Sequence, residues 1–378
     1  MIYENVYNET FELLKKLISI PSPSNNEKDI VIFISDLLKS MNIDSKLHYI
    51  STNSANLTAE IKSKFKGPTI ILAGHVDTVP IIDGWTYHPL NPSEIEDRIY
   101  GLGSSDMKAG IAIAIKIFQI FNNMKEKLRG TLKLLFVADE EGYSTGIKSI
   151  IQEGEVGGDA VFMIEPEYQP AIIGAVGKIL IKIKARGKAA HAALPEQGIN
   201  AIEETSKFIS NLGTIPKIKD SILPYQPYIV FNIKGGYEKY SVTLPDYCEA
   251  TVNKHTVESE SKEYILSELY SLEKQLDLKS NFAFEIIQPF YPSYIIEENF
   301  KYLNILKESY KTFTGNELKT AYGTGVSDAN CLVGIANIPT INFGPSGGSI
   351  HSPDEWVSKK QIINVINIYY DVLKKCLL

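Results

Sequence analysis

Three short apolar runs, at residues 69–73, 131–137 and 160–164, constrain the fold of this chain more than any other feature. Turn-forming residues bound each run, and an apolar segment of helical length, residues 109–121, separates the first two. Strands that are buried on both faces read as continuous apolar runs, and parallel sheets covered by helices contain strands of this kind. The alternation therefore predicts an α/β domain built on a mixed sheet whose buried strands are largely parallel.

Helical patterns flank this sheet in the sequence. Apolar residues at helical spacing between positions 11 and 18 predict a helix that ends before Pro21. Ser24 and Glu27 have the spacing of a capping box, which we expect to open a second helix with its apolar stripe at residues 30–38. Towards the C-terminus, the same reasoning predicts a helix at residues 300–313, a strand at 339–343 and a helix from residue 360.

The middle of the chain follows a different order. Its patterns predict a strand, a helix, two strands, a helix and a strand, at residues 179–186, 200–212, 228–233, 247–252, 260–276 and 281–287. This βαββαβ order is that of a ferredoxin-like domain. Residues 288–292 are expected to form a linker. The 378 residues suffice for two domains, and the simplest architecture is an α/β domain, residues 1–177 and 290–378, interrupted by a smaller inserted domain, residues 178–289.

Composition and charge argue against several classes of function. The formal net charge is −7 and no basic cluster is present, which disfavours a nucleic-acid partner. No apolar run reaches the roughly 18 residues that a membrane-spanning helix needs. The first residues lack the basic and apolar regions of a signal peptide, and the three cysteines lie far apart, which favours free thiols. We therefore expect a cytoplasmic protein without a membrane partner.

Histidine is scarce in this chain, and one of the six histidines directly follows a predicted strand. His75 and Asp77 come after the run at 69–73, and ligands of open α/β sheets bind at the carboxyl ends of strands. In an extended H-x-D sequence both side chains project to the same side, so Asp77 could support a metal-bound His75. An isolated H-x-D sequence also arises by chance, so this one needs further support.

A glycine-rich turn at residues 101–108 leads into the helix predicted at 109–121. A phosphate-binding loop is the obvious alternative. However, the turn lacks the GxxxxGK[ST] spacing and contains Asp106, whose carboxylate would repel a phosphate group. A carboxylate at the mouth of such a turn suits a metal ligand.

Acidic residues follow the other two predicted strands. Residues 139–141, Asp-Glu-Glu, come after the second run, and Glu165 follows the third. Adjacent acids at the end of a buried strand are unfavourable unless a cation lies nearby, although the triplet by itself could also be a solvated turn. His351 follows the strand predicted near the C-terminus through a glycine-rich loop. Two histidines and several carboxylates without cysteine suit zinc, cobalt or manganese.

With these residues in place, the sequence resembles the metallopeptidase family that includes acetylornithine deacetylase, succinyl-diaminopimelate desuccinylase, aminoacylase and glutamate carboxypeptidase. The resemblance covers nearly the whole chain, and its motifs occur in family order. They are GHVDTVP at 74–80, GSSDMKAG at 103–110, DEE at 139–141, IEP at 164–166, GKAAH at 187–191 and HSPDE at 351–355.

The resemblance implies a site with two divalent metal ions, most simply zinc, with cobalt and manganese as alternatives. One ion would be held by His75, Asp106 and Glu165. The other would be held by Asp106, Glu141 and His351, so that Asp106 bridges the two ions.

The resemblance also implies catalytic roles and a homodimer. Asp77 would orient the adjacent histidine ligand, and Glu140 would be the general base. The inserted domain would be a lid that also forms the dimer, and His191 would reach the active site of a second copy. A cis peptide bond is implied between Asp106 and Met107.

The sequence departs from the family in the inserted domain. Where the family has an arginine ten residues after a proline, this chain has His255, ten residues after Pro245. That arginine often binds the carboxylate of the substrate, so His255 stands where a carboxylate anchor is expected. The substrate-binding residues implied by the resemblance are Asn232, His255 and Gly325.

The expected function is cleavage of the amide bond of a small N-acyl amino acid by metal-activated water. A dipeptidase, carboxypeptidase or aminopeptidase acting on short peptides shares every metal residue, so it stays open as an alternative. A third interpretation is a non-catalytic binding or scaffold protein of the same fold. It conflicts with the presence of all five ligands, Asp77 and Glu140.

Overall fold

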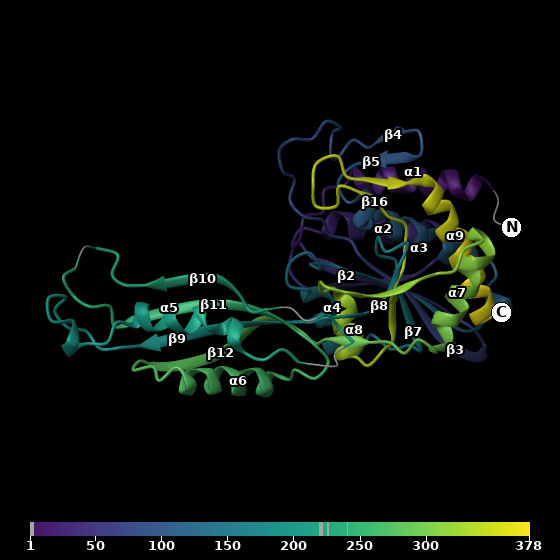
Figure 1. Cartoon of the computed structure of the whole chain (residues 1–378). Helices are drawn as coiled ribbons and strands as arrows, with labels where there is room; N and C mark the ends of the chain where they lie inside the picture. The colour runs from purple at the N-terminus through teal and green to yellow at the C-terminus, as the bar shows by residue number, and fades with distance from the viewer. Residues whose placement is uncertain (1–3, 219–221, 225–226, 240) are drawn as a thin grey trace. The chain divides into compact units, whose positions relative to one another are not determined.

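The computed structural model describes residues 4–218, 222–224, 227–239 and 241–378 (Figure 1). The chain divides into two compact units. Unit 1 comprises Met1–Ile173, Ile296–Ala321 and Ser327–Leu378, and unit 2 comprises Gly174–Ile295 and Tyr322–Val326. Unit 2 therefore interrupts unit 1 in the sequence, and it extends a few residues beyond 178–289 at each end.

Unit 1 is built on a mixed sheet in which strands follow the order β1-β2-β6-β3-β7-β15-β8. The central strands β6, β3, β7 and β15 are parallel, and the strands that flank them pair antiparallel. This confirms the predicted α/β class with its parallel core. The strand bounds are Ser45–Tyr49 for β1, Ala55–Lys62 for β2, Phe65–His75 for β3, Arg129–Val137 for β6, Ala160–Met163 for β7, Ala171–Ala175 for β8 and Thr340–Asn342 for β15.

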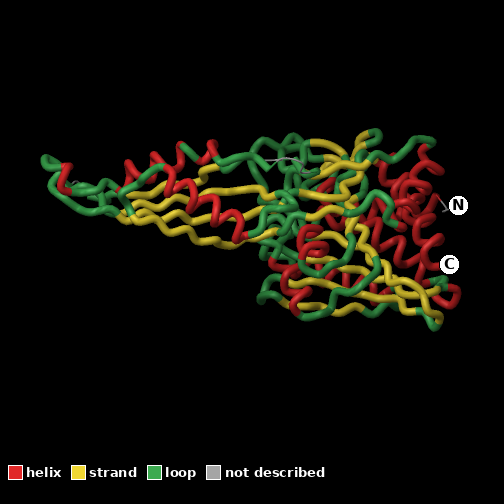
Figure 2. Tube along the Cα trace, turned by 60° about the horizontal axis from the view of Figure 1, so that its bottom comes forward, coloured by secondary structure: helices red, strands yellow, loops and turns green. Residues whose placement is uncertain are grey.

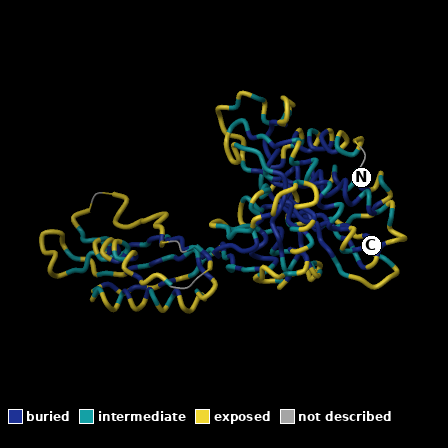
Figure 3. Tube along the Cα trace, turned by 45° about the vertical axis from the view of Figure 1, so that its right-hand side comes forward, coloured by how far each residue is buried: buried dark blue, intermediate teal, exposed yellow. Residues whose placement is uncertain are grey.

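Helices bury the apolar side chains of this sheet. α3 (Ala109–Asn122) packs on β3 and β6 and also contacts α1 (Glu4–Ile18) and α9 (Lys359–Leu377). Most of its residues are therefore buried, and Figure 3 shows buried residues throughout the interior of unit 1. Further helices of unit 1 are α2 (Lys28–Ser40), α4 (Thr145–Gln152), α7 (Lys301–Thr314) and α8 (Asp328–Gly334).

A small second sheet of unit 1 holds part of the C-terminal segment. It consists of β16 (Gly347–Gly348), β17 (Trp356–Ser358), β5 (Arg98–Tyr100) and β4 (Ser93–Ile95), in this order. Residues 349–355, which include His351, connect β16 to β17. Because β17 pairs with β5, this loop is held beside the chain that leads into the glycine-rich turn.

The capping box predicted for Ser24 and Glu27 is wrong. α2 begins after Glu27, but no side-chain hydrogen bond caps it. Instead, the Ser24 hydroxyl donates to Asp77 Oδ2 at 2.7 Å, and Glu27 Oε1 accepts the N–H groups of Asn25 and Asp139. Ser24 and Glu27 therefore bind residues that lie far away in the sequence instead of capping the helix.

In the described residues of unit 2, a four-stranded antiparallel sheet packs against the helices α5 and α6 (Figure 2). The strand order β10-β11-β9-β12 is that of a ferredoxin-like βαββαβ domain. Ile179, Ile181 and Ile183 of β9 pack into a cluster with Phe208 of α5 and Leu269 of α6. The elements are β9 (Gly177–Arg186), α5 (Ala201–Ser210), β10 (Ile229–Gly235), β11 (Tyr247–Thr256), α6 (Lys262–Gln275) and β12 (Asn281–Tyr291).

The linker predicted at residues 288–292 is also wrong, because most of that segment belongs to β12. The register of β12 against β9 shifts between Ile287 and Phe290, and this bulge contains Pro289. A proline lacks the N–H of a ladder hydrogen bond, so strands accept it at bulges and on edges. β12 is an edge strand, which is why it accommodates Pro289.

Two further expectations concern the chain as a whole. In the part of the chain that the structure describes, no helix has the length and apolar character to cross a membrane. The three cysteines, Cys248, Cys331 and Cys376, are free thiols, as their spacing predicts. The cytoplasmic location and the homodimer stay predictions.

Candidate metal centre

Of the five predicted metal residues of unit 1, one ends a strand, three follow strands and one precedes a helix. His75 ends β3, Glu141 follows β6, and Glu165 follows β7. Asp106 lies in the turn before α3, and His351 lies in the loop between β16 and β17. Because β6, β3 and β7 are adjacent parallel strands, their carboxyl ends meet at one edge of the sheet.

Asp106 lies between the two histidines. Its Oδ1 is 3.1 Å from His75 Nε2, and its Oδ2 is 3.4 Å from His351 Nε2. His351 Nε2 is also 2.7 Å from Glu141 Oε1, and His75 Nε2 is 3.8 Å from Glu165 Oε2. The five side chains therefore form two histidine-containing sets that share one carboxylate. Ligand atoms of His75, Asp106 and Glu141 lie within 4.8 Å of one another.

The second ring nitrogen of His75, Nδ1, lies close to Asp77. Nδ1 is 3.0 Å from the main-chain oxygen of Asp77 and 3.5 Å from its carboxylate Oδ1. The carbonyl is thus the closer acceptor, and it fixes the ring so that Nε2 points at Asp106. The Asp77 carboxylate instead accepts the N–H groups of Glu140 and Glu141, at 3.1 Å each.

The glycine-rich turn before α3 is held by Glu355. This buried carboxylate accepts the N–H groups of Gly103, Ser105 and Asp106 at 2.8, 2.8 and 3.0 Å. Gly103 has φ 74°, a conformation that glycine adopts readily. The amides that a phosphate loop would offer to a ligand are therefore occupied. The Asp106–Met107 peptide bond is cis, as the resemblance implies.

The centre contains more buried carboxyl groups than histidines, and this shifts the pKa values of both. Burial raises the pKa of Glu140 and of Glu165 well above the usual range. Burial alone would lower the pKa of His75, but the charges of Glu165, Asp106 and Asp77 outweigh it and raise that pKa. Hydrogen bonds to Asp106 and Glu141 raise the pKa of His351 to about 10. A divalent cation would offset the same negative charge that holds these protons, so the residues fit a metal.

Asp328 adds a further buried carboxyl that the sequence interpretation missed. It opens α8, and burial raises the pKa of Asp328 to about 7. Its charge also raises the pKa of Glu140, behind the larger effect of burial. No local pattern marks this residue, because a first-turn aspartate is ordinary at a helix start.

The remaining predicted site residues belong to unit 2. His191 is exposed and its Nδ1 accepts the N–H of Ala193 at 3.1 Å. Asn232 is exposed on β10, and Gly325 is exposed in the segment Tyr322–Val326. His255 is half-buried on β11.

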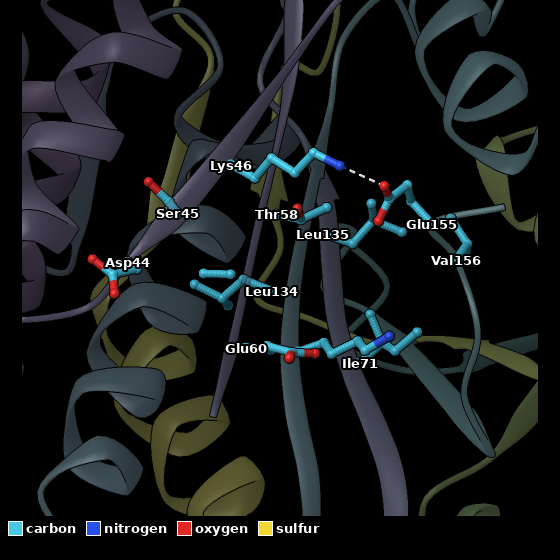
Figure 4. A pocket seen from close by; sticks show the side chains of 12 residues that line it. Asp44, Ser45, Lys46, Thr58, Glu60, Ile71, Leu134, Leu135, Glu155 and Val156 are labelled. Carbon is cyan, nitrogen blue, oxygen red and sulfur yellow. Dashed lines mark hydrogen bonds and ion pairs between the residues drawn. The ribbon is translucent and has the colours of Figure 1, made fainter. Parts of the chain in front are cut away.

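A separate cavity of about 350 Å³ lies on the sheet of unit 1 (Figure 4). Its walls include Lys46, Thr58, Leu135 and Glu155, and no predicted site residue lines it. Lys46 and Glu155 form an ion pair with each other. The cavity is therefore distinct from the metal centre.

The fold and this centre together define a metal-dependent hydrolase of amide bonds. The chain belongs to the peptidase family M20/M25/M40, whose sequence model matches residues 71–375. This confirms the family that the motifs predict.

Curated relatives extend over the whole chain. The succinyl-diaminopimelate desuccinylase of a Nitratiruptor species is 28% identical, and the alignment covers 97% of this chain and 99% of the relative. The probable succinyl-diaminopimelate desuccinylase of Staphylococcus aureus (strain MRSA252) is 25% identical, and the alignment covers 96% of each chain.

Solved structures share the fold. A tripeptidase from Staphylococcus aureus subsp. aureus mu50 has a TM-score of 0.80 at 21% identity, over 98% of both chains. The YXEP protein of Bacillus subtilis, described as a dinuclear metal-binding peptidase from the M20 family, has a TM-score of 0.74 at 17% identity, over 98% of both chains.

Proposed function

We propose that this protein hydrolyses the amide bond of a small N-acyl amino acid, using two divalent metal ions bound in unit 1. The observation that carries the proposal is the position of Asp106, with one carboxylate oxygen directed to each histidine. One carboxylate shared by two ligand sets suits a two-metal site. The full-length similarity to proteins named desuccinylases supports an N-acyl amino acid as the substrate class.

The proposed ligand sets follow the contacts. His75, Asp106 and Glu165 hold one ion, and Asp106, Glu141 and His351 hold the other. Nitrogen and oxygen ligands without cysteine favour zinc, with cobalt or manganese as substitutes. When bound, two such ions would supply Lewis acidity to the scissile carbonyl and to a water molecule.

Glu140 is the proposed general base. Burial raises the pKa of Glu140, so its carboxylate is a stronger base than that of an exposed glutamate. It takes a proton from the attacking water and delivers it to the leaving nitrogen. Its backbone N–H is bound to Asp77 Oδ1, which ties the base to the segment that carries His75.

Substrate recognition is proposed to involve unit 2, through His191, Asn232, His255 and Gly325. None of the three arginines of the chain, Arg98, Arg129 and Arg186, stands at the position where the family has its arginine, because this chain has His255 there. At that position a substrate carboxylate would be bound by histidine, a neighbouring lysine or backbone groups.

A homodimer formed through unit 2 is also proposed. All seven residues of the edge strand β10 are exposed, and Phe231 is 58% exposed. An edge strand offers unpaired backbone groups, and exposed apolar side chains on it favour pairing with another strand. A second copy, contributing His191 across the interface, is the proposed partner.

Hydrolysis of short peptides is the second candidate. It is supported by the similarity in fold to a protein named a tripeptidase, and it uses the same metal residues. The test is a screen of N-acetyl and N-succinyl amino acids against dipeptides and tripeptides, with added zinc or cobalt. A higher kcat/KM on the N-acyl amino acids supports the proposal. A higher value on peptides replaces it with the second candidate, and no hydrolysis in either set contradicts both.

A further inference from the structure

The N–H groups at the start of the turn that follows β6 donate to side chains of other segments. Four consecutive N–H groups, those of Ala138, Asp139, Glu140 and Glu141, donate in this order to Asn56 Oδ1, Glu27 Oε1, Asp77 Oδ1 and Asp77 Oδ2, at 3.0, 3.2, 3.1 and 3.1 Å. The backbone that carries the proposed base and a proposed ligand is therefore fixed from three other segments of unit 1.

Glu27 supplies one of these attachments from the N-terminal segment. Its side chain is fully buried, and its Oε1 also accepts the N–H of Asn25 at 2.6 Å. The Asn25 side chain donates to Asp139 Oδ1 at 3.3 Å. Asp139 is thus bound by this segment through both its main chain and its side chain.

Asn56 supplies a second attachment from β2. Its side chain is fully buried, and besides the N–H of Ala138 it binds the carbonyl of Gly146, to which its Nδ2 donates at 2.9 Å. One amide therefore connects the start of the turn to the start of α4. A Cβ at residue 146 would lie 2.6 Å from Asn56 Oδ1, so only glycine leaves room for this contact.

We propose that Glu27 and Asn56 are positioning residues for Glu140 and Glu141. The proposal rests on the proposed function, because Glu140 and Glu141 are the residues proposed there as general base and metal ligand. Neither Glu27 nor Asn56 belongs to the proposed ligand sets, and both act through the backbone of the turn. Since a displacement of about 1 Å can lower a rate about 100-fold, loss of either attachment should lower turnover and metal binding more than substrate binding.

The test compares variants that remove or keep the acceptor at position 27. Glu27→Ala removes it, whereas Glu27→Gln keeps a side-chain oxygen that can accept both N–H groups. Glu204 offers a matched control in unit 2, because its Oε2 also accepts two backbone N–H groups, those of Lys279 and Ser280 at 2.5 and 3.2 Å. Each variant is measured for kcat and KM, for zinc binding by titration calorimetry, and for thermal unfolding.

We expect Glu27→Ala to lower kcat about 10- to 100-fold and to weaken binding of one zinc ion, with KM little changed. Glu27→Gln should stay within about threefold of the wild type, and Glu204→Ala should leave kcat and zinc binding unchanged. Asn56→Ala should behave as Glu27→Ala does. If Glu27→Ala does not fold, Glu27→Asp, which withdraws the carboxylate by one methylene, takes its place.

Wild-type kcat and zinc affinity in Glu27→Ala, with only a lower unfolding temperature, would overturn the positioning role and leave the proposed function standing. A wild-type protein that binds zinc but hydrolyses no amide would overturn the proposed function instead. In that case the zinc affinity of Glu27→Ala against Glu27→Gln still decides whether the turn is positioned by Glu27.

Discussion

Lys178 of β9 lies directly opposite His255 of β11 in the antiparallel sheet of unit 2. Burial, followed by the positive charges of Lys178 and Lys254, lowers the pKa of His255 from its usual 6.5. His255 is therefore mostly uncharged at neutral pH. The position where the family has arginine thus combines a neutral imidazole with a neighbouring ammonium group.

This pair gives a prediction for the dependence of KM on pH. If a substrate carboxylate binds here, protonated His255 binds it more tightly, so KM should rise as the pH climbs through a pKa below 6.5 and then level off. Lys178→Met should raise KM about tenfold at neutral pH, the loss of one charged hydrogen bond. Lys182→Met, on the same face of β9, is the control. Identical KM profiles for wild type, Lys178→Met and His255→Ala would reject a role for either residue in binding substrate.

Glu140→Gln should retain metal and fold but lose activity by at least about 100-fold, because the amide cannot accept a proton from water. Metal content, the circular dichroism spectrum and kcat are measured on the same preparation. Glu60→Gln, on the exposed side of β2, serves as the control and should keep wild-type turnover. Turnover near the wild-type value in Glu140→Gln would mean that another group is the base.

Asp106→Ala should lose both metal ions, because one carboxylate is proposed to serve both ligand sets. Elemental analysis after dialysis gives the number of ions per chain. Glu165→Ala is the informative comparison, since it belongs to one set and should remove at most one ion. Two tightly bound ions in Asp106→Ala would rule out the bridge.

A mixture of inactive chains should regain activity if His191 acts across a dimer. Glu140→Gln and His191→Ala chains are combined under conditions that exchange subunits. One of the two sites in a hybrid then carries both intact residues, so about a quarter of wild-type activity is expected when hybrids make up half of the dimers. Subunit exchange confirmed by differential labelling, without any recovery, would count against a shared site.

The sequence predicts most of the fold and the strand-end residues for one physical reason. Buried parallel strands are apolar along their length, so His75, Glu141 and Glu165 stand out at the points where polar residues begin. Sheet geometry then brings those ends together without any knowledge of loop conformation. Asp106 and His351 lie in longer loops, whose conformation local patterns do not predict. Their assignment to the same site rests on the family resemblance.

The wrong capping box and the residues that the sequence does not mark have a common cause. Ser24 and Glu27 match a local capping pattern, but their partners are Asp77 and Asp139, which lie far away in the sequence. No local sequence pattern marks Asn56, because a single asparagine in a strand-like run has no spacing that predicts a role for it. Attachments between distant segments depend on the completed tertiary structure, so local sequence patterns do not predict them.

The place of β15 in the sheet bears on how the chain is assembled during synthesis. β15 lies between β7 and β8, although both strands precede it by more than 160 residues. All of unit 2 and most of the sheet of unit 1 leave the ribosome earlier, with a gap where a central strand belongs. A nascent chain that ends before Thr340 therefore exposes two unpaired interior strand edges, and these are the surfaces on which a chaperone or a misfolding contact would act.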